Sequence, residues 1–177
     1  MKTKDIIIQK GMEILTDTGY FATSIQNIVK AAGIPKGSFY YYFESKDMFC
    51  LEIINFCADE INRKTELYQN ENNSLDPKEY LKIIFTCKEG IILGKLIEEL
   101  TPKNEFLFQA LKLTIDQILK KIEEIFNQYA KKNAKDNLIQ PAAITKFFFY
   151  STLGLQNALK FHDKNNLEFD LIWEKII

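Results

Sequence analysis

The chain has 177 residues, of which 46% are hydrophobic and 27% are charged, the balance of a soluble globular protein with a sizeable core. This composition excludes disordered, collagen-like and low-complexity classes. Lys and Arg number 23 against 24 Asp and Glu, and the resulting net charge of −1 lacks the basic excess that nucleic-acid-binding proteins usually carry.

The first two predicted helices are separated by a turn that starts at Gly19. Apolar residues at helical spacing precede Gly19. We expect Gly19 to end this first helix in the left-handed conformation that glycine adopts readily. Thr23 followed by Gln26 matches a capping box, with Thr23 as the N-cap of the second helix. Gly33 is expected to end that helix.

Two further helix starts follow closely. A third helix can begin at Pro35, because a proline in the first turn loses no needed hydrogen bond. Ser45 is expected to cap a fourth helix, with Asp47 as a favourable acid in its first turn.

The rest of the chain also predicts helices only. They cover about residues 48–68, a helix that opens at Asp76-Pro77, a long helix over about 104–132, another over about 141–161, and a last one from about 167. Thr101-Pro102 marks the boundary before the long helix. With no strand alternation and no internal repeat, the sequence predicts an all-α protein.

Membrane, secretion and disulfide signals are missing from the sequence. The longest uncharged stretch, thirteen residues between Lys146 and Lys160, is shorter than the roughly twenty that span a membrane. The three cysteines, Cys50, Cys57 and Cys87, form no C-x-x-C motif. We expect buried thiols in a cytoplasmic protein with no membrane partner, the alternative being a redox sensor.

Catalytic constellations are equally hard to build. His162 is the single histidine, and neither metal-ligand spacing nor a glycine-rich phosphate loop is present. The sequence therefore predicts a protein that is not an enzyme and has no metal and no cofactor.

Residues 24–43 combine two short helices with a tight glycine turn, the pattern of a helix-turn-helix. Phe39 and Phe43 are four residues apart and can both face inward. Tyr40 and Tyr41 then face outward, where phenol hydroxyls can bind phosphate oxygens.

Two residues near this segment are unfavourable for an isolated helix. Gly37 costs about 1 kcal/mol of helix propensity relative to alanine, which makes sense where the backbone must approach DNA closely. Lys46 places a cation at a helix start, where it opposes the helix dipole unless an external anion such as phosphate binds there.

These motifs resemble the tetracycline-repressor (TetR) family. The resemblance covers residues 18–25, 31–43 and 45–47, within a match of about residues 5–55. It implies an all-α homodimer, with an N-terminal three-helix helix-turn-helix domain over residues 1–50. A larger C-terminal helical domain, residues 51–177, would bind a small-molecule inducer and the partner subunit.

The family's DNA-contacting roles can be carried over residue by residue. Thr23 and Ser24 would touch the DNA backbone at the start of the second helix, and Lys46 would hold a flanking phosphate. The recognition surface would comprise Lys36, Gly37, Ser38, Tyr40, Tyr41 and Tyr42, the last at a position where many members have histidine.

Dimer contacts are expected from two helices that resemble the family's four-helix dimer bundle. One is the apolar stripe of the long helix, which includes Leu111, Ile118 and Ile122 and is widened by Phe106 and Leu113. The other is a track of small residues formed by Ser151, Gly154 and Ala158. The alternative is that these residues only close the core of one chain.

The ligand pocket is implied by the family alone. Its candidate residues are Phe56, Phe85, Ile92, Leu96, Phe108 and Phe126, which could equally be simple core. The scarcity of charge within the apolar stripes favours a hydrophobic or aromatic effector, and Glu98-Glu99 is expected to be a solvated acidic pair.

The leading hypothesis is a transcriptional repressor that an inducer releases from a palindromic operator on double-stranded DNA. The alternatives are a small-molecule sensor or carrier, or a dimeric scaffold, with a DNA-binding head that does not function.

Overall fold

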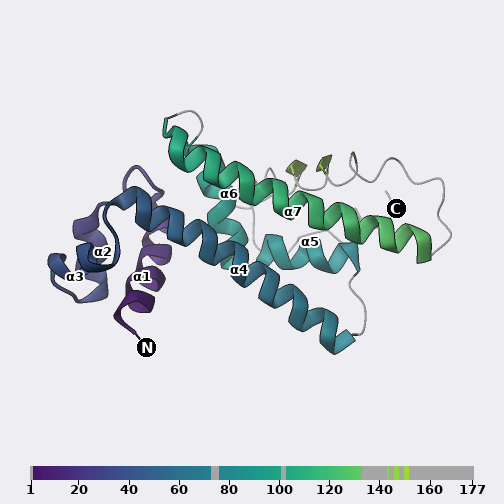
Figure 1. The fold of residues 1–177 in the computed structure, drawn as a ribbon, viewed down its shortest axis with the longest axis horizontal. Coiled ribbons are helices and arrows are strands. Elements are labelled where there is room, and N and C mark those ends of the chain that lie inside the picture. The colour runs from purple at the N-terminus through teal and green to yellow at the C-terminus, as the bar shows by residue number, and fades with distance from the viewer. Residues whose placement is uncertain are drawn as a thin grey trace. The chain divides into compact units, whose positions relative to one another are not determined.

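A computed structural model describes residues 2–72, 76–100 and 103–132, together with residues 143, 146, 147, 150 and 151. Within this part of the chain it contains seven labelled α-helices and no strand (Figure 1), which confirms the predicted all-α class. The helices are α1 Thr3–Thr18, α2 Ile25–Ala32, α3 Lys36–Tyr42, α4 Lys46–Asn72, α5 Pro77–Thr86, α6 Lys88–Leu100 and α7 Glu105–Lys132.

The first helix ends where the sequence predicts, at Gly19. Its φ of 80° is positive as expected, but its ψ of 174° lies outside the left-handed helical region, so the predicted conformation is wrong in detail. The Gly19 N–H donates to the carbonyl of Leu15 at 3.0 Å.

The second helix begins one residue later than predicted, because Ser24 and not Thr23 is its N-cap. The Ser24 hydroxyl accepts the Asn27 N–H at 3.1 Å. Thr23 is buried, and its hydroxyl donates to the Gly19 carbonyl at 2.6 Å, so it is not available to cap a helix. Gly33 ends α2 in the left-handed conformation as predicted.

The short helix α3 rests on an aromatic cluster. Phe39 and Phe43 are buried, as predicted, and both pack against Phe49 at the start of α4, with ring centroids 5.4 and 5.1 Å apart. Gly11 on α1 lets this cluster approach, since a Cβ at that position would overlap the Phe49 ring. The predicted cap of α4 is also confirmed, as Ser45 accepts the Met48 N–H at 3.1 Å.

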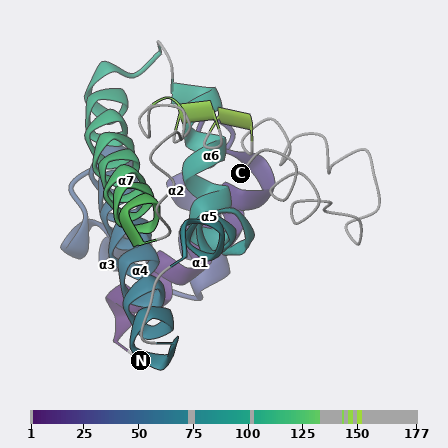
Figure 2. The same ribbon diagram turned by 90° about the vertical axis from the view of Figure 1, so that its right-hand side faces the viewer.

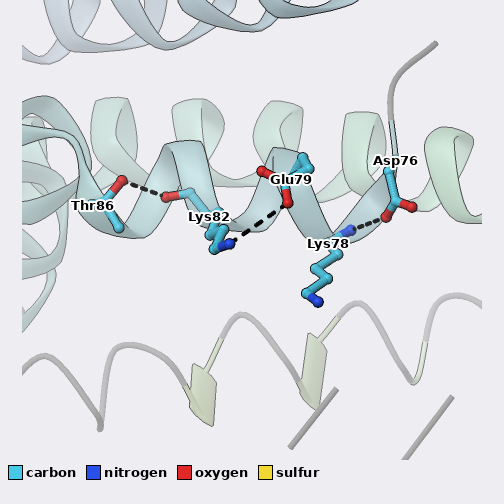
Figure 3. A network of polar contacts seen from close by, with 5 residues as sticks. All are labelled: Asp76, Lys78, Glu79, Lys82 and Thr86. Carbon is cyan, nitrogen blue, oxygen red and sulfur yellow. Dashed lines mark hydrogen bonds and ion pairs between the residues drawn. The ribbon is translucent and has the colours of Figure 1, made fainter. Parts of the chain in front are cut away.

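The sequence predicts the start of α5 but not its end. Asp76 caps α5 by accepting the Lys78 N–H at 2.7 Å, and Glu79 pairs with Lys82 one turn later (Figure 3). The sequence indicates no boundary between Pro77 and Thr101, yet Cys87 is extended, with φ −78° and ψ 148°, and separates α5 from α6. Neither glycine nor proline marks this break.

The long helix α7 starts at Asn104, whose side-chain oxygen accepts the Leu107 N–H at 3.1 Å. Its predicted apolar stripe is buried at Leu107, Leu111, Ile115, Ile118, Ile122 and Ile125. Phe106 and Leu113, which were expected to widen the stripe, are instead 50% and 64% exposed.

The chain divides into two compact units. One comprises Met1–Ile61 with Lys88–Ile115, and the other Asn62–Cys87 with Asp116–Ile177. In the first, α1 packs against α2 and α6, and α2 against α3 (Figure 2). The predicted division into residues 1–50 and 51–177 stays a prediction. No helix of the described chain is both long and apolar enough to cross a membrane.

Candidate nucleic-acid interface

The outer face of α3 carries three tyrosines in a row. Tyr41 is 81% exposed, Tyr40 48% and Tyr42 37%, whereas Phe39 on the inner face is fully buried. Such exposed aromatic surface is unusual for a helix of a monomer. The predicted split between inward phenylalanines and outward tyrosines is therefore confirmed.

The side chains on this face are held in part by one another. The Lys36 ammonium lies 5.9 Å from the centroid of the Tyr40 ring, and the Tyr41 and Tyr42 rings meet edge to face at 4.9 Å. Gly37 is exposed, and a Cβ built there would meet no atom within 4 Å. The face therefore combines a cation, phenol hydroxyls and bare backbone, groups that can contact phosphates and base edges.

The start of α2 supplies less than the sequence predicts. Ser24 is exposed at the N-terminus of the helix, with its hydroxyl used as the cap. The Thr23 side chain is only 2% exposed. Its hydroxyl faces the turn and Thr18, at 3.1 Å from the Thr18 Oγ1, so the structure does not place it for the predicted contact with DNA.

Lys46 already has protein partners. Its ammonium donates to the carbonyls of Tyr20 at 3.0 Å and Thr23 at 3.1 Å, and lies 4.1 Å from the centroid of the Tyr20 ring. These contacts relieve the unfavourable position of a cation at a helix start without an external anion. Its predicted role in holding a phosphate stays a prediction.

Tyr20 is the centre of a partly buried polar network. Its phenol donates to Asp47, and the second oxygen of that carboxylate accepts the Asn104 side-chain amide at 3.0 Å. Burial, and then the hydrogen bond to Asp47, raise the pKa of the Tyr20 phenol far above its usual range. The phenol is therefore a permanent donor, which ties the turn after α1 to α4 and α7.

Two residues of α6 hold the same turn and were missed by sequence reasoning. Glu99 accepts the Tyr20 N–H at 2.5 Å, and Lys95 donates to the Thr16 carbonyl at 2.6 Å. The expectation of a solvated Glu99 is therefore wrong. No local signal could have found these contacts, because the partners lie 79 residues apart in the sequence.

The candidate ligand residues fall into different environments. Ile92, Leu96 and Phe126 are each 2% exposed, as expected of core residues. Phe108 is half-buried, and the Phe85 side chain lies outside the described residues. Phe56 lines a cavity of about 370 Å³ together with Lys4, Asp5, Ile8, Gln9, Met12, Glu52 and Lys88.

The candidate dimer residues on α7 are not free in the single chain. Leu111, Ile118 and Ile122 are between 0% and 5% exposed, which favours the alternative that they close the core of one subunit. Ser151 is exposed, whereas Gly154 and Ala158 lie outside the described residues. Among the described residues, no group of three His, Cys, Asp or Glu side chains could hold a metal ion.

The sequence matches known regulators over this same region. Residues 7–53, which contain α2 and α3, match the family described as "Bacterial regulatory proteins, tetR family". Over 154 residues the chain is 25% identical to the HTH-type transcriptional repressor DhaR of Mycobacterium sp. (strain GP1), covering 84% of this chain and 77% of DhaR. Residues 7–53 of the chain are thus similar to the DNA-binding region of TetR-family regulators.

Solved structures of regulators share the fold of this chain. The regulatory protein TetR from Rhodobacter sphaeroides matches with a TM-score of 0.75 and 25% identity, over 89% of this chain and 88% of that one. AibR, solved with isovaleryl coenzyme A and operator DNA, shares the fold at a TM-score of 0.71 and 21% identity, over 98% and 95% of the two chains. The chain is a DNA-binding transcriptional regulator.

Proposed function

We propose that this protein is a TetR-family repressor that binds a palindromic operator as a homodimer and is released by a small-molecule inducer. The observation that carries the proposal is the outer face of α3, where Lys36, Gly37 and exposed tyrosines stand on a buried Phe39. The similarity to DhaR, a transcriptional repressor, supports repression. The AibR complex with both a coenzyme A thioester and DNA supports control by an effector.

The proposed DNA-binding residues follow from exposure and position. They are Ser24, Lys36, Gly37, Ser38, Tyr40, Tyr41, Tyr42 and Lys46. No Arg, Asn or Gln lies between Pro35 and Phe43, so Lys36 is the strong base-reading side chain of this helix, directed to guanine. Phenol hydroxyls and backbone N–H groups then serve mainly as phosphate contacts, which set register more than sequence preference.

An electrophoretic mobility shift with the DNA upstream of the protein's own gene tests the proposal. We expect Lys36→Ala and Tyr40→Ala to weaken binding, whereas Lys120→Ala, which removes an exposed cation from α7, leaves it unchanged. Wild-type affinity should also fall steeply with salt, since a dimer releases counterions from several phosphates. Equal binding by wild type and both α3 variants would refute the assignment of the recognition helix.

The inducer is proposed to be a hydrophobic or aromatic small molecule that binds among the helices beyond residue 50. Ligand-dependent stabilisation of the folded protein would accompany its binding. A screen that finds such stabilisation but no DNA binding to any sequence would instead favour the sensor or carrier alternative. A dimer with neither property would favour the scaffold.

A further inference from the structure

The turn between α1 and α2 is held from outside the family's DNA-binding region. Glu99, near the C-terminal end of α6, directs a carboxylate oxygen to the Tyr20 N–H at 2.5 Å. One turn earlier on the same helix, Lys95 donates to the Thr16 carbonyl at 2.6 Å. Both side chains therefore bind the backbone of the segment that leads into α2, although neither lies within residues 7–53 that match the family.

The backbone at Gly19 is built around the Glu99 carboxylate. A Cβ placed on Gly19 would overlap both oxygens and the carboxyl carbon of Glu99. Gly19 also has a φ of 80°, which side chains other than glycine adopt at a cost. The missing Cβ and the positive φ of Gly19 thus both accommodate the carboxylate of Glu99, which lies 80 positions further along the chain.

Other helices complete this anchorage of Tyr20. The Lys46 ammonium of α4 donates to the Tyr20 carbonyl, and the Asp47 carboxylate of α4 accepts the Tyr20 phenol. The side-chain amide of Asn104, at the start of α7, donates to the same carboxylate. With Glu99 on its N–H, every polar group of Tyr20 is bound. The residue is therefore a fixed point from which the chain departs into α2 and the recognition helix.

This anchorage lies within one compact unit. That unit joins Met1–Ile61 with Lys88–Ile115, so α6 and the start of α7 belong with the DNA-reading helices. Besides the packing of α2 on α1, the hydrogen bonds that Thr23 and Ser24 make among the described residues run to neighbours in the chain and to Lys46, so the bonds of Tyr20 add the longer-range support of this turn. A lost hydrogen bond at Tyr20 would therefore be felt mainly as misplacement of α2 and α3.

We propose that Glu99 is a positioning residue for operator binding, which acts through the Tyr20 N–H and touches no DNA itself. A backbone N–H bound to a carboxylate makes a stronger hydrogen bond than one bound to a neutral acceptor. Loss of the acceptor leaves that N–H without its partner in a partly buried turn and costs the desolvation of the group. Lys95 supports the same end of α1 but contributes less to the position of the turn, because it binds a residue three positions before Gly19.

The test compares Glu99→Ala, Glu99→Gln and the control Glu66→Ala, which removes an exposed glutamate from α4. The DNA is a duplex selected from a random pool by the wild-type protein, and affinity is measured by fluorescence anisotropy. We expect Glu99→Ala to weaken specific binding about tenfold, the size of one lost hydrogen bond to a charged group. Glu99→Gln, which keeps an acceptor oxygen, should restore most of it, and Glu66→Ala should have no effect.

A second pair of measurements separates positioning from a general loss of structure. The Glu99→Ala variant should bind non-specific DNA with the wild-type affinity and salt dependence, because the number of phosphate contacts is unchanged. Amide hydrogen exchange should accelerate at Tyr20 and in α2, and stay unchanged in α5. Equal specific affinity of wild type and Glu99→Ala, or no rescue by Gln, would overturn the proposal.

The outcome also distinguishes this proposal from the proposed repressor function. If the wild type selects no duplex, operator binding itself fails. Exchange at Tyr20 and in α2 then decides whether Glu99 anchors the turn, and unchanged exchange in Glu99→Ala would overturn that anchorage.

Discussion

Single residues in the first compact unit are fitted to one another more closely than their types suggest. Gly11 lies in the middle of α1, where glycine normally weakens a helix by about 1 kcal/mol relative to alanine. Its Cβ position is taken by the ring of Phe49, which Phe39 and Phe43 hold from other sides. The glycine therefore serves packing between α1 and α4.

Gly11→Ala is expected to lower the free energy of unfolding by about 1–3 kcal/mol, the usual cost of overpacking. The Phe49 ring cannot move aside without displacing its two aromatic neighbours. Urea denaturation measures the effect. A variant as stable as the wild type would show that the cluster can relax, and that the helix-propensity gain of alanine prevails.

Cys50 illustrates how burial sets chemistry at a single side chain. Burial, and then the nearby Asp47 carboxylate, raise the pKa of its thiol from 9.0 to about 12. The thiolate is the reactive form, so folded Cys50 should resist iodoacetamide at pH 8, as should the fully buried Cys57. Half-buried Cys87 should be alkylated first.

Mass spectrometry of the alkylated protein checks this order, with complete alkylation in urea as the control. The raised pKa has a second consequence. The unfolded thiol ionises above about pH 9 while the folded thiol stays protonated, so the contribution of Cys50 to stability falls as pH rises past 9. Rapid labelling of Cys50 in the folded protein would contradict the account.

At the scale of helices, the competition between Thr23 and Ser24 shows how a cap is chosen. Both residues suit an N-cap, but the Thr23 hydroxyl is used inside the turn and Ser24 is left for the Asn27 N–H. Ser24→Ala should therefore lower the free energy of unfolding by about 1 kcal/mol. Gln26→Ala, which would disrupt the capping box expected from the sequence, should have no effect in the same urea titration.

In α5, the removal of a buried hydroxyl is expected to leave the protein as stable or to stabilise it. The Tyr80 phenol is fully buried, and among the described residues it has no hydrogen-bond partner. Burial raises its pKa above the usual range. Because an unpartnered buried donor is costly, Tyr80→Phe should leave the thermal midpoint unchanged or raise it. A clear fall in the midpoint would mean that the hydroxyl has a partner in solution.

At the scale of the whole molecule, local signals predicted the helices well. Asp76-Pro77, Gly33 and the Phe39–Phe43 spacing each act within a few residues, and the structure confirms all three. The break at Cys87 has no such signal. The contact between Glu99 and Tyr20 depends on how distant helices pack, which sequence periodicity does not encode.

The apolar stripe of α7 allowed two interpretations for a related reason. A buried helix face and a face that meets a second subunit have the same pattern of apolar residues. Burial in the single chain favours a core role for Leu111, Ile118 and Ile122, and their contact with a second subunit stays a prediction. Net charge was also uninformative, since the cations at the α3 face are few and act by position.

The central claim, that the outer face of α3 binds DNA, is tested most directly by Gly37→Ala. A Cβ at Gly37 meets nothing within 4 Å in the free protein. The free energy of unfolding of the variant should therefore equal that of the wild type or exceed it by up to about 1 kcal/mol, because alanine has the higher helix propensity. Against DNA the same methyl group would stand where the backbone approaches the groove. Fluorescence anisotropy with a wild-type-selected duplex should therefore show at least about a tenfold loss of affinity. Unchanged affinity in a stably folded Gly37→Ala variant would contradict the claim.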